Sequence, residues 1–329
     1  MDDVYYRATI KSAAGITGHF RYKDVFQIQS SSKSDSSFNH YIDIEFNDKY
    51  RLNDGTEERK NCLGQGYGHL DFLKELIAIL HICSNYPCSL DKDESCVTPP
   101  PQEIISGFTE HPPLFPGFTS PREFSGSSTV RRDNVRILNR MNFGQSSLEL
   151  QSQTELFLDK YFSLDARTRK RFNASMFLMQ NSHEIKLINQ SMGIVGLISA
   201  IENLMELEVK KNKIKIEKCE KCSQPIYGLA ERFRNFLATY SEANFVKKYN
   251  IGEYFHREDE FKDNEPEELI ASFYRRRSKI THAGDILIMD RTLSTFSASE
   301  LRYFNEIETA VRIALFSYLL NFSRDAGHE

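Results

Sequence analysis

The chain has 329 residues, of which 40% are hydrophobic and 27% are charged, and these are ordinary values for a globular protein. A formal net charge of -4 and a pI near 6.2 exclude a generally basic coat for nucleic acids, so any contact with RNA must be local. No apolar run approaches the roughly 20 residues that span a bilayer, and the first residues lack the layout of a signal peptide. We therefore expect a cytoplasmic protein of two domains that does not enter a membrane.

The first part of the chain combines strand patterns with one helix pattern. Ile42, Ile44 and Phe46 alternate with acidic residues, which is typical of a half-buried strand. Residues 4–10 and 20–29 also favour strands. A helix is expected next, from apolar residues that recur every three to four positions. These residues are Leu70, Leu73, Ile77 and Leu80. We predict an α+β domain over residues 1–87.

Prolines concentrate in the middle of the chain. Eight of the ten prolines lie between Pro87 and Pro121, and residues 125–128 add serine and glycine. Proline removes a backbone donor and fixes φ, so this composition disfavours helices and central strands. We predict an irregular connector over residues 88–145.

Every convincing pattern after the connector has the period of a helix. The series starts at 156–162, continues on one face from Ile194 to Met205, and includes further helices at 228–241 and 266–281. The clearest pattern is an apolar stripe from Leu301 to Leu319, which lasts about six turns. Residues 146–329 therefore predict an all-α helical bundle.

One arginine falls where a helical bundle normally places an apolar residue. At about 100° per residue, Arg277 points into the middle of the apolar arc of helix 266–281, and a buried guanidinium there requires an anionic partner or ligand. His282 follows near a helix end that Gly284 indicates, and it faces about 140° away from Arg277 on an ideal helix. The two converge if the helix breaks at Thr281 or if a second copy supplies matching groups. We favour the second copy, aided by the break.

The surroundings of these residues resemble a known family. The pattern Tyr-x-x-Arg-Ser-Lys-Ile-x-His-Ala-Gly, which ends at Gly284 before a long terminal helix, is similar to the HEPN superfamily and specifically to its ApeA-like branch. The run from Cys219 to Tyr227, followed by Arg232, is similar to the same branch, and the resemblance covers residues 146–329. Many HEPN proteins carry Asn directly after the arginine, where this chain has Ser278.

The resemblance implies a HEPN-like, metal-independent endoribonuclease without a cofactor, whose catalytic site forms in a homodimer of the helical domain. His282 would be the general acid or base for attack by a ribose 2′-OH, since imidazole titrates near neutral pH. Arg277 would stabilise the phosphate. The branch further implies abortive-infection defence against phage, with RNA such as tRNA as substrate, a phage-derived trigger and a regulatory N-terminal domain. The alternatives are a non-catalytic module that binds RNA or protein, and a toxin held by a separate antitoxin.

Other polar residues admit two interpretations. Glu202 could position His282 or an RNA hydroxyl, but a solvated or bundle-pairing glutamate is the simpler expectation. Cys219 and Cys222 have the spacing of a zinc knuckle but lack a second Cys-x-x-Cys, so a relic knuckle or two packed thiols is the simpler expectation, and we assign no metal ligands. The lysines of 210–221 and the basic residues of 167–171 could contact phosphates, although solvated surface is again simpler.

Overall fold

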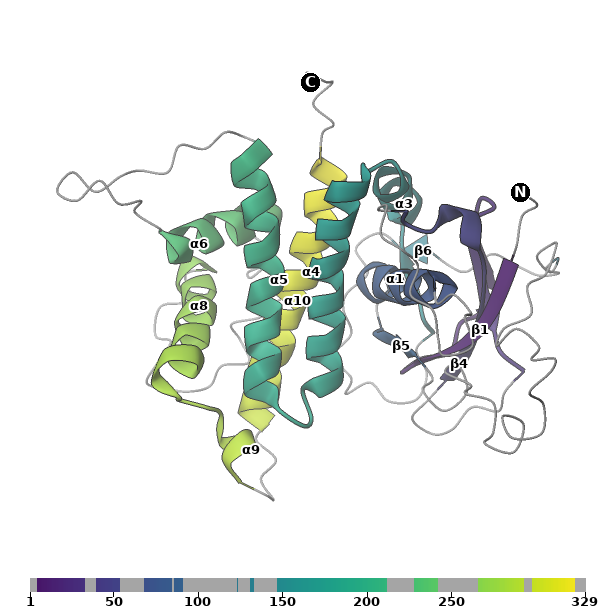
Figure 1. Ribbon diagram of the computed structural model, residues 1–329. Helices are drawn as coiled ribbons and strands as arrows, with labels where there is room; N and C mark the ends of the chain where they lie inside the picture. The colour runs from purple at the N-terminus through teal and green to yellow at the C-terminus, as the bar shows by residue number, and fades with distance from the viewer. Residues whose placement is uncertain are drawn as a thin grey trace, which may run out of the picture. The chain divides into compact units, whose positions relative to one another are not determined.

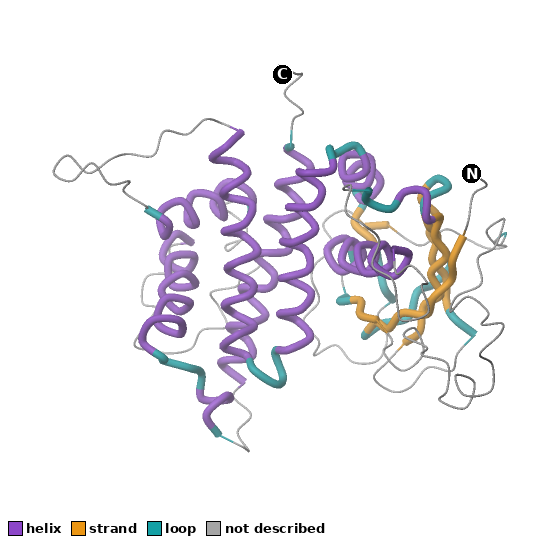
Figure 2. Tube along the Cα trace, viewed as in Figure 1, coloured by secondary structure: helices purple, strands orange, loops and turns teal. Residues whose placement is uncertain are grey.

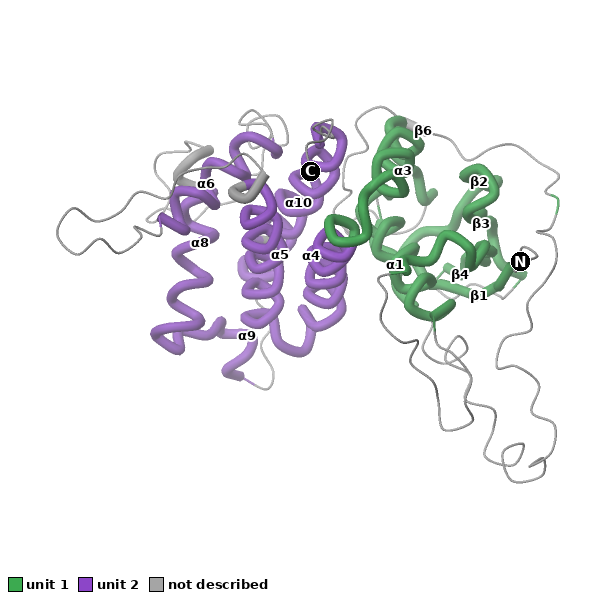
Figure 3. Tube along the Cα trace, turned by 45° about the horizontal axis from the view of Figure 1, so that its top comes forward, with its two compact units in different colours: residues 1–169 green, residues 170–329 purple. Residues whose placement is uncertain are grey.

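The structure is a computed structural model that describes residues 5–32, 40–53, 68–84, 86–90, 123, 131–132, 147–211, 228–241, 266–292 and 298–322 (Figure 1). The chain divides into two compact units, Met1–Arg169 and Lys170–Glu329, shown in Figure 3. The first contains an antiparallel sheet with helices, and the second, called the helical unit below, is mostly helical, as Figure 2 shows. An α+β part followed by a helical part is what the sequence predicts.

Five strands form the antiparallel sheet of the first unit, in the order β2-β3-β4-β1-β5. They are β1 (Tyr5–Ser12), β2 (His19–Tyr22), β3 (Phe26–Ser30), β4 (His40–Asn47) and β5 (Cys88–Leu90). The segment 20–29, in which strands were expected, forms the hairpin β2–β3, whose turn contains Lys23 at φ 49. A short 3-10 helix, η1 (Asp48–Tyr50), follows β4.

The range 88–145, expected to be an irregular connector, lies mostly outside the described residues. Where it is described, two short strands occur: β5 pairs with β1, and β6 (Arg131–Arg132) pairs in parallel with β7 (Leu150–Gln151). Strands of two or three residues are too short to show an alternating pattern, which is why the sequence did not indicate them. The domain boundaries at 87 and 145 stay predictions, and the compact units divide after Arg169.

Strand β4 is buried on both faces, so the expectation of a half-buried strand is wrong. On one face, Phe46 meets Phe72 of α1 (Gly68–Cys83) edge-on, with ring centroids 5.7 Å apart. On the other face, Glu45 accepts hydrogen bonds from Arg7 Nε at 2.6 Å and from Gln27 Nε2 at 2.7 Å. A buried carboxylate is tolerated when its acceptor atoms are satisfied in this way. The helix expected from Leu70 onwards is confirmed as α1.

The N-terminal turn of α4 (Ala166–Ile185) belongs to the first unit and holds a buried ion pair. Arg169 is 7% exposed and its Nε donates to Glu75 Oε1 at 2.8 Å. Its guanidinium also lies 5.1 Å from the ring centroid of Tyr161 and 4.9 Å from that of Phe162, both on α3 (Thr154–Phe162). Arg169 is therefore enclosed by its own unit and is not available to RNA.

The helical unit contains the rest of α4 with α5 (Gln190–Lys211), α6 (Leu229–Tyr240), α8 (Pro266–Ala283), α9 (Ile288–Arg291) and α10 (Ala298–Asn321). Figure 1 shows α4, α5 and α10 side by side, and α5 also packs against α6 and α8. The four later helices expected from apolar periodicity are all present. No helix within the described ranges combines the length and apolarity that crossing a bilayer requires.

Close packing of α5 depends on a glycine. A Cβ at Gly193 would lie 2.6 Å from Cε2 of Phe304 on α10, a side chain that is fully buried. The missing side chain lets α10 approach α5, and that approach fixes the helix carrying Glu202 within the core.

Candidate functional site

Helix α8 carries both residues that the sequence singles out. It continues through Thr281, whose hydroxyl donates to the carbonyl of Arg277 at 3.0 Å, and it ends at Ala283. Gly284 follows at φ +65, where a residue without Cβ is favoured, and the amide of Asp285 donates back to the carbonyl of Lys279 at 3.2 Å. The helix break considered at Thr281 is therefore not found, because the turn to non-helical backbone comes at Gly284.

The guanidinium of Arg277 has the anionic partner that its place on the helix predicts. Its Nη2 lies 3.2 Å from Oε2 of Glu202 on α5, and the two side chains are 22% and 20% exposed. Tyr274, one turn earlier on α8, donates its hydroxyl to the other carboxylate oxygen of Glu202 at 3.3 Å. Glu202 is thus a bundle-pairing glutamate that joins α5 to α8.

The side chain of Tyr274 lies beside the ion pair of Arg277 and Glu202 and packs against an aromatic ring of α6. Its ring lies 5.8 Å from Cζ of Arg277 and 5.4 Å from the ring of Phe233 on α6. Burial, together with the negative charge of Glu202, raises the pKa of the Tyr274 hydroxyl, while Arg277 opposes that rise. The hydroxyl therefore stays protonated at neutral pH and serves as a donor to Glu202.

The guanidinium keeps hydrogen-bonding capacity beside this ion pair. Glu202 is contacted through Nη2, whereas Nε of Arg277 is buried and has no hydrogen-bond partner among the described residues. A buried donor without an acceptor is unfavourable. An oxyanion that reached this edge of the guanidinium would satisfy that nitrogen, which is how arginine binds phosphate through two parallel hydrogen bonds.

His282 lies in the last turn of α8, and its side chain is exposed. In the described part of the chain it makes no hydrogen bond or ion pair. Since α8 is a regular helix between Arg277 and His282, the two directions differ by about 140°. Arg277 faces Glu202, and the structure does not bring His282 to it within one copy.

The remaining candidates of the sequence are partly outside the described residues. Cys219 and Cys222 lie there, together with the lysines from 213 to 221. Arg171, in the basic segment at the start of α4, donates to Asn203 Oδ1 at 2.5 Å and pairs with Glu206 at 3.0 Å. Arg171 is thus engaged with α5, and Arg167 stays exposed.

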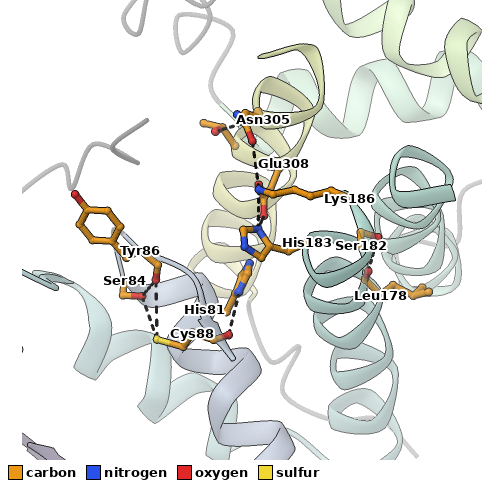
Figure 4. Close-up of polar contacts among 11 residues, drawn as sticks. His81, Ser84, Tyr86, Cys88, Leu178, Ser182, His183, Lys186, Asn305 and Glu308 are labelled. Carbon is orange, nitrogen blue, oxygen red and sulfur yellow. Dashed lines mark hydrogen bonds and ion pairs between the residues drawn. The ribbon is translucent and has the colours of Figure 1, made fainter. Parts of the chain in front are cut away.

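The sequence did not single out a polar cluster between α4 and α10. His183 is hydrogen-bonded to Glu308 through Nδ1, and Nζ of Lys186 lies 3.4 Å from Glu308 and 3.4 Å from Asn305 (Figure 4). The side chain of Lys186 is only 3% exposed. The positive charge of Lys186 disfavours the binding of a metal ion by His183 and Glu308. We therefore interpret the cluster as a contact that joins α4 and α10 by charge and hydrogen bonds. A sequence signal existed, because Asn305 and Glu308 have the i, i+3 spacing of one face of α10, and His183 and Lys186 have the same spacing across the end of α4.

The described residues define a two-unit protein, with an antiparallel sheet in one unit and an Arg–Glu–Tyr cluster among the helices of the other. Comparisons of the chain with protein-family profiles, with curated proteins and with solved structures found no match.

Proposed function

We propose that this protein is a metal-independent endoribonuclease of the HEPN type, and that its helical part cuts RNA. The observation that carries the proposal is the state of Arg277. Its guanidinium occupies a half-buried position on α8, pairs with Glu202 through one nitrogen, and keeps a buried Nε without a partner among the described residues. A phosphate group is the ligand that this geometry suits best.

The chemistry needs a base and an acid besides the charge of Arg277. His282 removes the proton from a ribose 2′-OH, whose oxygen attacks the adjacent phosphorus, or it protonates the leaving 5′-oxygen. The bond from phosphorus to the 5′-oxygen breaks, which leaves a 2′,3′-cyclic phosphate and a 5′-OH. Arg277 donates to the oxygens that gain charge as the pentacoordinate phosphate forms.

The proposed catalytic site includes two copies of the chain. One regular helix points Arg277 and His282 in different directions, so a single α8 presents them to different surfaces. A two-fold axis places the same surface of both copies together, so groups from the two chains can line one groove. We therefore propose a homodimer formed through the helical part.

The biological role rests on the resemblance of residues 146–329 to ApeA-like HEPN domains. We propose that cleavage of host RNA, with tRNA as a candidate substrate, halts an infected cell in response to a phage-derived trigger. The N-terminal α+β part would restrain the nuclease or sense the trigger, because an unrestrained ribonuclease harms its own cell.

The first test is cleavage by the purified full chain of total RNA in EDTA. We expect fragments that end in 2′,3′-cyclic phosphate, because no step uses a metal. The matched control is Arg275→Ala, which removes an exposed arginine from the same helix and should leave cleavage intact. The same RNA ends should appear in cells that co-express the chain with phage proteins, the proposed trigger. RNA that stays intact in both experiments would contradict the nuclease activity and favour a non-catalytic binding module.

A further inference from the structure

Exposed apolar side chains gather at one end of the helical unit. Five of the seven large hydrophobic side chains that are exposed in the described part of the chain belong to the α4–α5 turn, the start of α5, and the segment 286–288 at the beginning of α9. Figure 1 shows the α4–α5 turn and α9 at the same end of the helical unit. We call them the apolar end patch: Leu187 at 67% exposed, Ile188 at 83%, Met192 at 50%, Ile286 at 37% and Ile288 at 50%.

Hydrogen bonds hold the two segments of the patch together. The carboxylate of Asp290 on α9 accepts from the amides of Gln190 at 2.8 Å and Ser191 at 2.7 Å, at the N-terminus of α5. A carboxylate is favourable there because it satisfies unpaired amides and the positive end of the helix dipole. The hydroxyl of Ser191 in turn accepts from the amide of Leu287 at 2.8 Å.

A second set of bonds fixes the same region to α10. The carboxylate of Glu300 accepts from the amides of Ile288 at 2.9 Å and Met289 at 3.0 Å, and the backbone carbonyl of Glu300 accepts from the Gln190 side chain at 2.7 Å. Gln190 and Ser191 are 0% and 1% exposed. Buried polar groups thus hold these segments together, and the apolar side chains of the patch lie outside them, whereas Leu287 between Ile286 and Ile288 is buried.

The exposure of the apolar end patch has an energetic meaning. Single exposed hydrophobic residues are normal on a protein surface, but a contiguous group on a rigid frame marks an interaction surface. Since the hydrogen bonds already order both segments, little conformational entropy remains to be lost when a partner covers the patch.

We propose that the apolar end patch is the surface through which two copies of this chain associate. The patch consists of two ridges, one from the α4–α5 turn and one from residues 286–288, and a two-fold axis can place each ridge against the other ridge of the second copy. Its rim carries both signs of charge, since Asp285 pairs with Arg291 at 2.8 Å and with Arg276 at 3.5 Å. These exposed pairs are weak and can be exchanged between copies.

The charges of the rim also argue against a lipid surface as the occupant. A lipid surface would favour a rim of positive charge alone, whereas Asp285 lies between two arginines. The patch begins close to the end of α8 in the sequence, since Ile286 follows His282 by four positions. Pairing through the patch therefore brings the two His282 residues toward a common interface. This inference deepens the proposed function, which requires a second copy, but it is tested without RNA.

The test is sedimentation velocity of the full chain over a range of concentrations, with one charged variant for each ridge, Ile188→Glu and Ile288→Glu. In a two-fold contact each new carboxylate enters an apolar interface twice, so we expect the dimer dissociation constant to rise by about tenfold or more. Leu229→Glu is the matched control, since Leu229 is a 41% exposed residue of α6, a helix of the same unit that contributes no residue to the patch. It should leave the dissociation constant unchanged, and circular dichroism should show all three variants folded.

Two results would overturn the patch as the dimer contact. One is a wild-type chain that is monomeric at about 100 µM. The other is a dimer whose dissociation constant is the same in Ile188→Glu and Ile288→Glu as in Leu229→Glu. A wild-type dimer that these variants dissociate, but that cuts no RNA, supports the patch and removes the proposed nuclease. Variants that become monomeric and keep full RNA cleavage support the patch and remove the two-copy catalytic site.

Discussion

Arg277 pairs with Glu202 in a position that is still one-fifth open to solvent. Ion pairs with this exposure contribute little to stability, on the order of 0 to 1 kcal/mol, because water screens the charges. The Nε of Arg277, which has no hydrogen-bond partner among the described residues, contributes nothing to stability, and burying such a donor is unfavourable. A half-buried arginine that stabilises so little is better explained by an anionic ligand than by packing.

We expect Arg277→Ala and His282→Ala each to reduce RNA cleavage by roughly 100-fold or more, because each removes a group that acts on charge in the transition state. The melting temperature should change by less than about 4 °C, since the ion pair is weak and His282 is exposed. Cleavage assays and calorimetry on the same preparations measure both effects. If Arg277→Ala unfolds the chain, the arginine is an anchor of the bundle.

The effect of the Glu202 charge can be measured as a change in the pKa of the Tyr274 hydroxyl. Glu202→Gln keeps an acceptor for the Tyr274 hydroxyl but removes the negative charge that helps burial to raise its pKa, so that pKa should fall while staying above its ordinary value. A tyrosine whose pKa is raised by folding stabilises the fold below about pH 10, and this stabilisation is lost as the pH rises further. Because the pKa shift is smaller in Glu202→Gln, this variant should lose less stability at alkaline pH than the wild type does. NMR of ¹³C-labelled tyrosine measures the titration.

Glu206→Gln is the control for that titration, because Glu206 lies one turn further along α5 and pairs with Arg171. It should leave the pKa of Tyr274 unchanged. An equal shift in both variants would mean that the general charge of α5, and not the contact with Glu202, sets the pKa.

At the scale of the element, the contact between α5 and α10 depends on the absence of one side chain. Gly193→Ala would bring a methyl group to 2.6 Å from Phe304, which is fully buried, so that the ring or a helix must shift. We expect a loss of about 1–2 kcal/mol, the cost of overpacking after the helix-favouring effect of alanine is subtracted. Chemical denaturation measures it. Gly228→Ala at the N-cap of α6 is the control, since among the described residues its new methyl group would meet Glu231 alone, at 3.5 Å. A similar loss there would contradict the packing argument.

Elements with a sustained pattern could be predicted from the sequence, and short or weakly patterned ones could not. Strand β4 and helix α10 repeat their apolar positions over many residues. Helix α4 was not outlined, because its first turns are basic and its last turn carries His183, which the buried Lys186 follows just beyond the helix end. Partners on α10 compensate for the polarity of both residues. Helix α9 has four residues, fewer than any periodic pattern needs.

The candidate site was predictable to a similar extent. Helical geometry alone predicted that Arg277 faces an anionic partner, but the choice of Glu202 depends on how α5 packs against α8, which is a tertiary property. The break at Thr281 was wrong because a threonine hydroxyl bonds within its own helix and Gly284 supplies the turn. The apolar end patch could not be predicted from the sequence, because Leu187 and Ile188 have residue types that are usually buried. Their exposure follows from the turn in which they lie, which is a property of the fold.

At the scale of the whole molecule, the proposed active site is shared between chains, and this has a consequence for mixtures. A homodimer of Arg277→Ala lacks both arginines, and a homodimer of His282→Ala lacks both histidines, so each alone should be inactive. A mixed dimer retains one Arg277 from one chain and one His282 from the other. If a site takes these groups from different chains, the mixed dimer has one intact site.

Co-expression of the two variants should therefore restore RNA cleavage. Random pairing makes half of the dimers mixed, each with one of two sites, so the mixture should reach about one quarter of the wild-type activity per chain. Each variant expressed alone is the control for background. The salt dependence should match the wild type, since the restored groove contacts phosphate with the same groups. A mixture in which mixed dimers are present and inactive would show that each site takes Arg277 and His282 from one chain, and full activity in a strict monomer would refute the shared site altogether.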